Sequence, residues 1–94
     1  MKMTGFIWLE DIVQKLVQKH GVRREEVREV FQNRPYFRFV EKGHRRGENV
    51  YAAFGQTEAG RYLIVFFVHK QDGRALILSA RAMTESERRR YEQR

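Results

Sequence analysis

The pattern of hydrophobic and polar positions changes its period near Pro35. Before this residue, apolar side chains recur every three or four positions, which is the spacing of an amphipathic α-helix. This spacing predicts helices over residues 9–20 and 23–33. Gly21 stands where a residue with left-handed backbone geometry commonly ends a helix, and Pro35 ends the second helix because proline cannot continue it.

After Pro35 the chain is rich in aromatic and β-branched residues, which favour strands. We expect four strands, over residues 35–41, 49–55, 61–70 and 74–81. The third is apolar on both faces and is therefore expected at the centre of a sheet. Asp72-Gly73 predicts a hairpin between the last two strands, because this pair accepts positive φ angles at low cost. A short strand around residues 6–8 also fits the pattern.

The last element begins at Thr84. A threonine followed three residues later by Glu87 forms a capping box, which predicts a helix over residues 85–93. The predicted order is two helices, a four-stranded antiparallel meander and a short C-terminal helix. Helices followed by a run of strands indicate an α+β fold, and we expect one domain over residues 1–94.

The fourth predicted strand turns polar toward its end. Alternation places an apolar set on one face, which should meet the helices: Leu76, Leu78 and Ala80. The other face carries Ala75, Ile77, Ser79 and Arg81. If the hairpin pairs its strands in simple register, Arg61 lies near Ser79 and Arg81. Two guanidinium groups and a hydroxyl would then gather at one end of the sheet.

The charge of the chain suggests what this sheet end binds. The 94 residues include 19 Lys and Arg against 12 Asp and Glu, a formal net charge of +7. Residues 61–83, the most apolar part, contain four basic side chains and one acidic one. A basic domain predicts a polyanionic partner such as RNA. Arginine suits phosphate because its planar group forms paired hydrogen bonds and keeps its proton.

Composition also excludes several classes of protein. The chain has no cysteine, which excludes disulfides, thiolate metal sites and thiol nucleophiles. No apolar stretch approaches the roughly 20 residues of a membrane span, and the first residues lack the pattern of a secretory signal. The three histidines have no metal-ligand spacing. We therefore expect a cytoplasmic protein without a metal, a cofactor or a membrane partner.

The residues at the predicted sheet end suit RNA cleavage, in which the 2′-hydroxyl attacks the neighbouring phosphate. Arg61 and Arg81 would stabilise the charge of the transition state, and Ser79 would position a phosphate oxygen. The group that moves the proton stays open among three candidates: His44, Glu48 and Tyr51. Further contacts to the RNA backbone are expected from Arg45, Arg46, Lys70, Arg74 and Arg88.

A series of short motifs resembles a known family. The chain carries, in order, KHGV at residues 19–22, Glu25-Glu26, Val30-Phe31, Gly60-Arg61, Ser79-Ala80-Arg81, Glu87-Arg88-Arg89 and Tyr91. This series resembles the BrnT-type toxins of bacterial toxin–antitoxin systems over about residues 8–91. The resemblance implies a RelE-like fold, a metal-independent endoribonuclease that halts translation, and a cognate DNA-binding antitoxin. A homodimer or a hetero-oligomer with that antitoxin is also expected.

Two sets of positions depart from the family pattern. Leu9, Ile12 and Leu16 stand where many relatives have polar residues, and Val50 stands where relatives often have an arginine. Other functions therefore stay open. The chain could be a non-catalytic RNA- or ribosome-binding module, a subunit that recognises only an acidic partner, or a degenerate toxin that retains only antitoxin binding.

Overall fold

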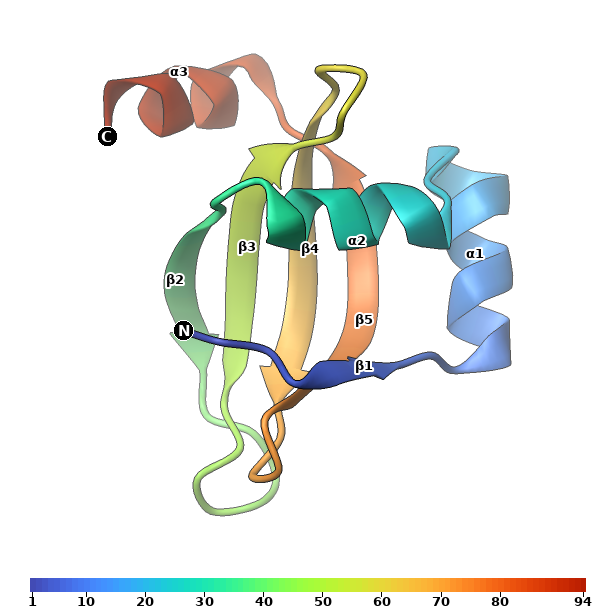
Figure 1. Cartoon of the computed structure of the whole chain (residues 1–94), viewed down its shortest axis with the longest axis vertical. Coiled ribbons are helices and arrows are strands. Elements are labelled where there is room, and N and C mark those ends of the chain that lie inside the picture. Colours follow the sequence, from blue (N-terminus) through green and yellow to red (C-terminus); the bar gives the residue numbers. More distant parts are fainter.

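A computed structural model describes all 94 residues, and it has a mixed sheet with helices on both faces (Figure 1). The helices are α1 (Glu10–His20), α2 (Arg24–Gln32) and α3 (Glu85–Gln93). The strands are β1 (Gly5–Ile7), β2 (Tyr36–Glu41), β3 (Val50–Gln56), β4 (Tyr62–His69) and β5 (Arg74–Ala82). The α+β class is confirmed. None of the three helices has the length and apolar character that a membrane crossing needs.

The sheet has five strands in the order β1-β5-β4-β3-β2, so the expected count of four is wrong. Strands β2 to β5 form the predicted antiparallel meander. The additional strand, β1, pairs with β5 in parallel, with Phe6 opposite Ala75. At three residues it is too short to show a clear alternation in sequence, although the segment around residues 6–8 hinted at it.

The local signals for helix ends and turns are confirmed. Gly21 has φ 60°; its N–H donates to the carbonyl oxygen of Val17, and the N–H of Val22 donates to that of Leu16, at the end of α1. Thr84 and Glu87 form both hydrogen bonds of the capping box that begins α3. Gly73 has φ 91° in the turn between β4 and β5. These signals are reliable because each depends on residues only a few positions apart.

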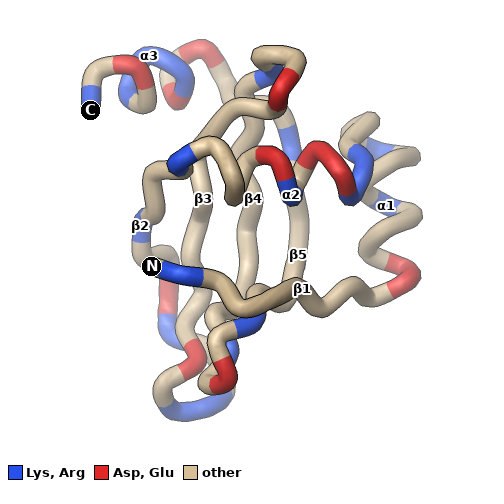
Figure 2. The backbone as a smooth tube through the Cα atoms, in the orientation of Figure 1, with Lys and Arg blue, Asp and Glu red and all other residues tan.

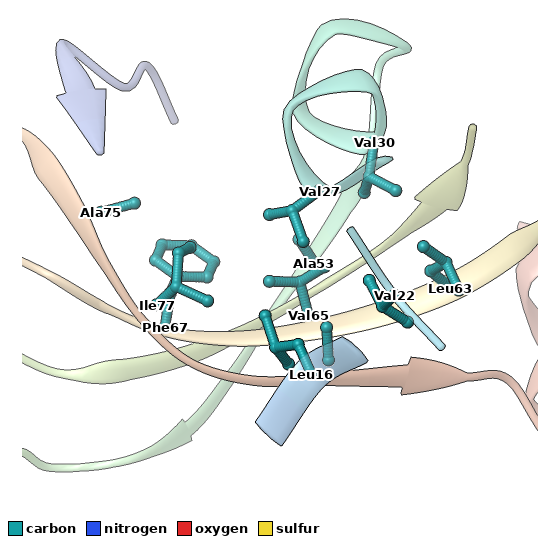
Figure 3. Close-up of a cluster of buried hydrophobic side chains, with 11 residues drawn as sticks. Leu16, Val22, Val27, Val30, Ala53, Leu63, Val65, Phe67, Ala75 and Ile77 are labelled. Atoms are coloured by element: carbon teal, nitrogen blue, oxygen red, sulfur yellow. The ribbon is translucent and has the colours of Figure 1, made fainter. Parts of the chain in front are cut away.

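Helices α1 and α2 cover one face of the sheet, which we call the inner face, and the core lies between them (Figure 3). The buried cluster includes Leu16 from α1, Val27 and Val30 from α2, and Phe67 from β4. Gly55 allows α2 to approach β3 closely, because a Cβ at this position would lie 3.0 Å from Cγ1 of Val30. The opposite, outer face is covered in part by α3 (Figure 1).

Strand β5 contains a β-bulge that changes which side chains point inward. Phe67 pairs with Ile77, but Phe66 pairs with Ser79, so Leu78 is an extra residue without a partner. The extra residue reverses the alternation in the second half of the strand. The buried residues of the inner face are consequently Ala75, Ile77 and Ala80, all 0% exposed. The predicted apolar face of Leu76, Leu78 and Ala80 is therefore wrong.

Candidate functional site

Arg61 and Arg81 lie at the same end of the sheet but on opposite faces, so their predicted convergence is wrong. Without a bulge, the pairing of β4 with β5 would place Arg81 opposite Leu63. Arg81 would then point to the inner face, where Arg61 lies. The bulge shifts this register, and Arg81 pairs with Ile64 instead. Ser79 moves with Arg81 to the outer face, opposite Phe66. Arg61 remains on the inner face.

Arg61 holds α1, α2 and the start of β4 together. Its Nη1 donates to the carbonyl oxygen of Gly21 at 2.7 Å and to both carboxylate oxygens of Glu26 at 3.1 Å. Its Nη2 donates to the carbonyl oxygen of His20 at 3.1 Å. Burial by itself would raise the pKa of Glu26, but hydrogen bonds from the Arg23 backbone and the Arg61 guanidinium lower it below its usual value. These contacts leave Arg61 with a structural role.

Arg81 forms a bidentate ion pair with Glu87 of α3. The two nitrogen–oxygen distances are 2.7 and 2.9 Å, and the guanidinium carbon lies 5.8 Å from the centre of the Phe66 ring. Glu87 also accepts a hydrogen bond from the backbone of Thr84 at 2.8 Å. The hydrogen bonds from Arg81 lower the pKa of Glu87 to about 2. This carboxylate is therefore charged at neutral pH and anchors α3 to β5.

A second group of predicted residues lies at the other end of the sheet, in the loop between β2 and β3. The side chain of Glu48 binds Lys70 at 2.7 Å and the backbone N–H of Gln71 at 3.1 Å. The hydrogen bond from Lys70 lowers the pKa of Glu48. Both of its oxygens are occupied, so Glu48 fastens this loop to the β4–β5 hairpin and is not an unpaired base. Figure 2 shows acidic and basic residues interspersed here.

The remaining predicted residues do not form one cluster. His44, Arg45 and Arg46 are exposed in the same loop. Tyr51 packs on the inner face, with its ring 6.0 Å from that of Phe67. Arg74 pairs with its neighbour Asp72 at 2.8 Å on the β4–β5 hairpin.

Arg88, on the outside of α3, lies 4.0 Å above the ring of Tyr62 and 3.7 Å from Glu92. It is therefore already engaged with two side chains of the chain. The residues that the sequence proposed are thus divided between the inner face, the outer face and the loop end of the sheet.

The structure reveals a groove that the sequence did not predict, with a volume of about 370 Å³, between α3 and the outer face of β2 and β3. It is lined by Tyr36, Arg38, Phe54, Glu87, Arg90, Tyr91, Gln93 and Arg94. Three of these are arginines, and none of them takes part in the seven ion pairs of the chain. The only carboxylate is Glu87, which Arg81 already neutralises. The groove is therefore strongly positive.

The arginines of the groove come from two walls. Arg90 and Tyr91 lie in α3, and Arg94 is the residue that caps its C-terminal end. Arg38 follows Tyr36 on the outer face of β2, at the spacing of a strand. Both elements are predicted from the sequence, but only the packing of α3 against β2 brings them together. Tyr36 of β2 and Phe54 of β3 supply aromatic rings to this groove.

Guanidinium groups beside aromatic rings suit nucleic acid, because arginine binds phosphate in pairs of hydrogen bonds and aromatic rings stack on bases. The chain has no group of three or more His, Asp or Glu side chains that could hold a metal ion. A basic groove with aromatic walls has the chemistry that suits a single strand of RNA or another flexible polyanion.

The fold and this basic groove define a small α+β domain of the kind seen in toxin ribonucleases. The crystal structure of the Brucella abortus ribonuclease toxin, BrnT, superposes with a TM-score of 0.60 at 16% identity, and the match covers 89% of this chain and 100% of that one. Residues 8–87 match the family described as ribonuclease toxin, BrnT, of type II toxin-antitoxin system, and the chain belongs to this family. No curated protein sequence matches it.

The family confirms the resemblance that the sequence motifs indicated. A member is a ribonuclease toxin of a type II system, so the family implies an RNA substrate and an antitoxin partner. The similarity to the Brucella protein shows the shared fold.

Proposed function

We propose that this toxin is a metal-independent endoribonuclease that halts translation in the cytoplasm, and that its RNA binds in the groove beneath α3. The observation that carries this proposal is the set of three arginines without carboxylate partners, Arg38, Arg90 and Arg94, in the groove. Seven of the 19 Lys and Arg residues are engaged in ion pairs, and these three are unpaired residues that line one groove together. Unpaired cations can bind phosphate without first breaking an internal contact.

The chemistry is attack of a ribose 2′-hydroxyl on the adjacent phosphorus, which breaks the bond to the 5′-oxygen and leaves a cyclic phosphate. Arginines on both walls of the groove would hold the phosphate and stabilise the negative charge of the transition state. Ser79 and Arg81 lie on the same outer face, where Glu87 neutralises Arg81. His44, a candidate for proton transfer from the sequence, is exposed in the β2–β3 loop at the opposite end of the sheet from α3 (Figure 1), and it does not line the groove.

The first prediction is that Arg38→Ala and Arg90→Ala each slow RNA cleavage by about 10- to 100-fold, because each removes a charge-assisted contact to phosphate. The measurement is the rate of fragment formation from a single-stranded RNA in EDTA. Arg24→Ala is the matched control. Arg24 is an exposed arginine of α2, the helix that covers the inner face of the sheet, whereas the groove lies on the outer face. Equal rates for all of these variants would contradict the groove as the site.

Arg81→Ala is a poor test of catalysis, although the sequence pointed to it. Its loss would release Glu87 and loosen α3, so a lower rate would have two explanations. The side chains of Arg38 and Arg90 form no hydrogen bond or ion pair within the chain, which makes their variants easier to interpret.

One observation favours a second candidate, a non-catalytic RNA-binding module. The groove contains no histidine or lysine, and its only carboxylate is paired with Arg81. A binding module would bind RNA in the same groove, with the same loss of affinity in Arg38→Ala, but would yield no fragments at protein excess.

The antitoxin is expected to be a small DNA-binding protein that neutralises the toxin, as the family resemblance implied. We propose that it forms a hetero-oligomer with this chain, and co-purification of the two proteins as one complex is the test. We also propose that the toxin forms a homodimer in the absence of the antitoxin, and that its fold is RelE-like.

A further inference from the structure

We propose that the groove beneath α3 binds one unstacked nucleobase, with Tyr36 as the surface on which the base stacks and Gln93 as the residue that reads its edge. This inference rests on the proposed function, because it assumes that RNA occupies the groove. It adds a substrate class, unpaired RNA, and names a residue that determines base preference.

The size of the groove fits this occupant. Its volume of about 370 Å³ lies near the lower end of the range for pockets that hold small molecules. A single nucleotide therefore fills it, and a stack of several bases or a duplex does not. A base can enter only when it is unpaired and turned out of the stack, as in single-stranded RNA.

Tyr36 offers an accessible aromatic surface inside the groove. The residue is 43% exposed, on the edge strand β2, where Phe39 and Val40 are exposed as well. Its ring centre lies 6.2 Å from that of Phe54, which lines the same groove. An exposed ring costs nothing to uncover, and stacking of a base on an aromatic side chain contributes substantially to single-strand binding.

Gln93 supplies the only amide among the lining residues. An amide side chain has both a donor and an acceptor, so it can form paired hydrogen bonds with the edge of a base. The arginines of the groove provide only donors, and they suit phosphate rather than one particular base. Gln93 is therefore the lining residue best suited to discriminate between bases.

The arginines place the backbone of the same nucleotide. Arg38 lies on the sheet wall, and Arg90 and Arg94 lie on the helix wall. Arg94 is also fixed, because its guanidinium lies 3.9 Å above the ring of Tyr91 and donates to the Tyr91 carbonyl oxygen at 2.7 Å. Phosphates on either side of the bound base can thus meet a cation on each wall.

The test measures binding of short single-stranded RNAs whose 2′-hydroxyls are methylated, so that they cannot be cleaved by 2′-hydroxyl attack. Tyr36→Ala is expected to weaken binding by about 5- to 100-fold, the effect of losing one stacked base, while Tyr36→Phe retains affinity. Phe39→Ala is the matched control. Phe39 is a 55% exposed aromatic on the same strand, but it lies with Tyr51 on the inner face.

Base reading has its own measurement. Wild-type protein should distinguish strands that differ at one base, and Gln93→Leu should reduce this difference by lowering affinity for the preferred strand. Loss of the preference supports the assignment, and an unchanged preference in Gln93→Leu overturns the role of Gln93.

A second measurement does not depend on the folding of Tyr36→Ala. A strand that carries 2-aminopurine should change its fluorescence on binding wild-type protein, because stacking quenches this base. Unchanged emission of the bound strand, or wild-type affinity in Tyr36→Ala, overturns the base pocket. If either result is obtained but the wild-type protein still cleaves RNA, and Arg38→Ala slows this cleavage, the proposed function stands and only the base pocket is rejected. If it neither binds nor cleaves RNA, both proposals fail.

Discussion

At the scale of single residues, the position of Arg81 is compatible with two roles, one in catalysis and one in holding α3 against the sheet. Its place at a polar strand end made it a candidate for catalysis, yet both of its terminal nitrogens bind Glu87. Glu87 accepts a third hydrogen bond from Thr84 and so joins the end of β5 to the first turn of α3. The pair determines where one wall of the groove stands.

The ion pair predicts a specific pH dependence. The pKa of Glu87 falls from 4.5 to about 2 on folding, so this group stabilises the folded state fully above about pH 4.5 and loses that contribution as the pH falls toward 2. Glu87→Gln should lower the free energy of unfolding at pH 7 by on the order of 1 kcal/mol, since the pair is partly exposed. Urea unfolding at several pH values checks this.

The comparison between wild type and variant isolates Glu87, because Glu26, Glu48 and Asp72 also have lowered pKa values and contribute to both curves. The stability difference should shrink as the pH falls from 5 to 2. A constant difference over this interval would show that Glu87 does not titrate as described.

At the scale of elements, the turn between β4 and β5 depends on glycine for two reasons. Gly73 has φ 91°, and a Cβ there would lie 2.8 Å from Cγ2 of Thr4. Thr4 cannot easily yield, because its hydroxyl donates to the carbonyl oxygen of Asp72 and its N–H donates to that of Gly73. This turn therefore also fixes the segment that leads into β1.

We predict that Gly73→Ala destabilises the protein by about 2–4 kcal/mol, from backbone strain together with overpacking. Gly60→Ala is the matched control, because Gly60 has φ 87° but no atom within 4 Å of its Cβ position. It should cost about 1–2 kcal/mol from strain alone. Thermal unfolding of both variants measures the difference, and equal losses would mean that the contact with Thr4 contributes nothing.

The elements also show which parts of the fold the sequence could predict. Helix ends, the capping box and the Asp72-Gly73 hairpin were correct, because each depends on neighbours in the chain. The bulge at Leu78 was missed, because it depends on how β5 fits against β4. The groove was missed for a similar reason, since Arg38 and Arg90 lie far apart in sequence and meet only when α3 packs against the sheet.

At the scale of the whole molecule, the net charge of +7 attracts any polyanion. Direct contacts to phosphate are expected where arginines have no carboxylate partner within the chain, as in the groove. Arginine–phosphate contacts displace counterions from a single strand, with a slope of about −0.7 per contact in a plot of log affinity against log salt. Three groove arginines therefore predict a slope of about −2.

The last prediction is that Arg38→Ala reduces the steepness of this plot by about 0.7. Fluorescence anisotropy with a short RNA at several salt concentrations measures it. Arg24→Ala, which removes the same charge from α2, should leave the slope unchanged. Equal changes in the two variants would indicate a general attraction to the molecule rather than phosphate binding in the groove.

The unpaired residue of β5 has a consequence for how this protein can change over evolution. Before Leu78 the strand contributes Ala75 and Ile77 to the interior, and after it the strand presents Ser79 and Arg81 to the outside. The alternation of inward and outward side chains in β5 is therefore reversed at Leu78. Ser79 and Arg81 point outward only because of the extra residue, and loss of a single residue at this junction would turn Arg81 inward, away from Glu87.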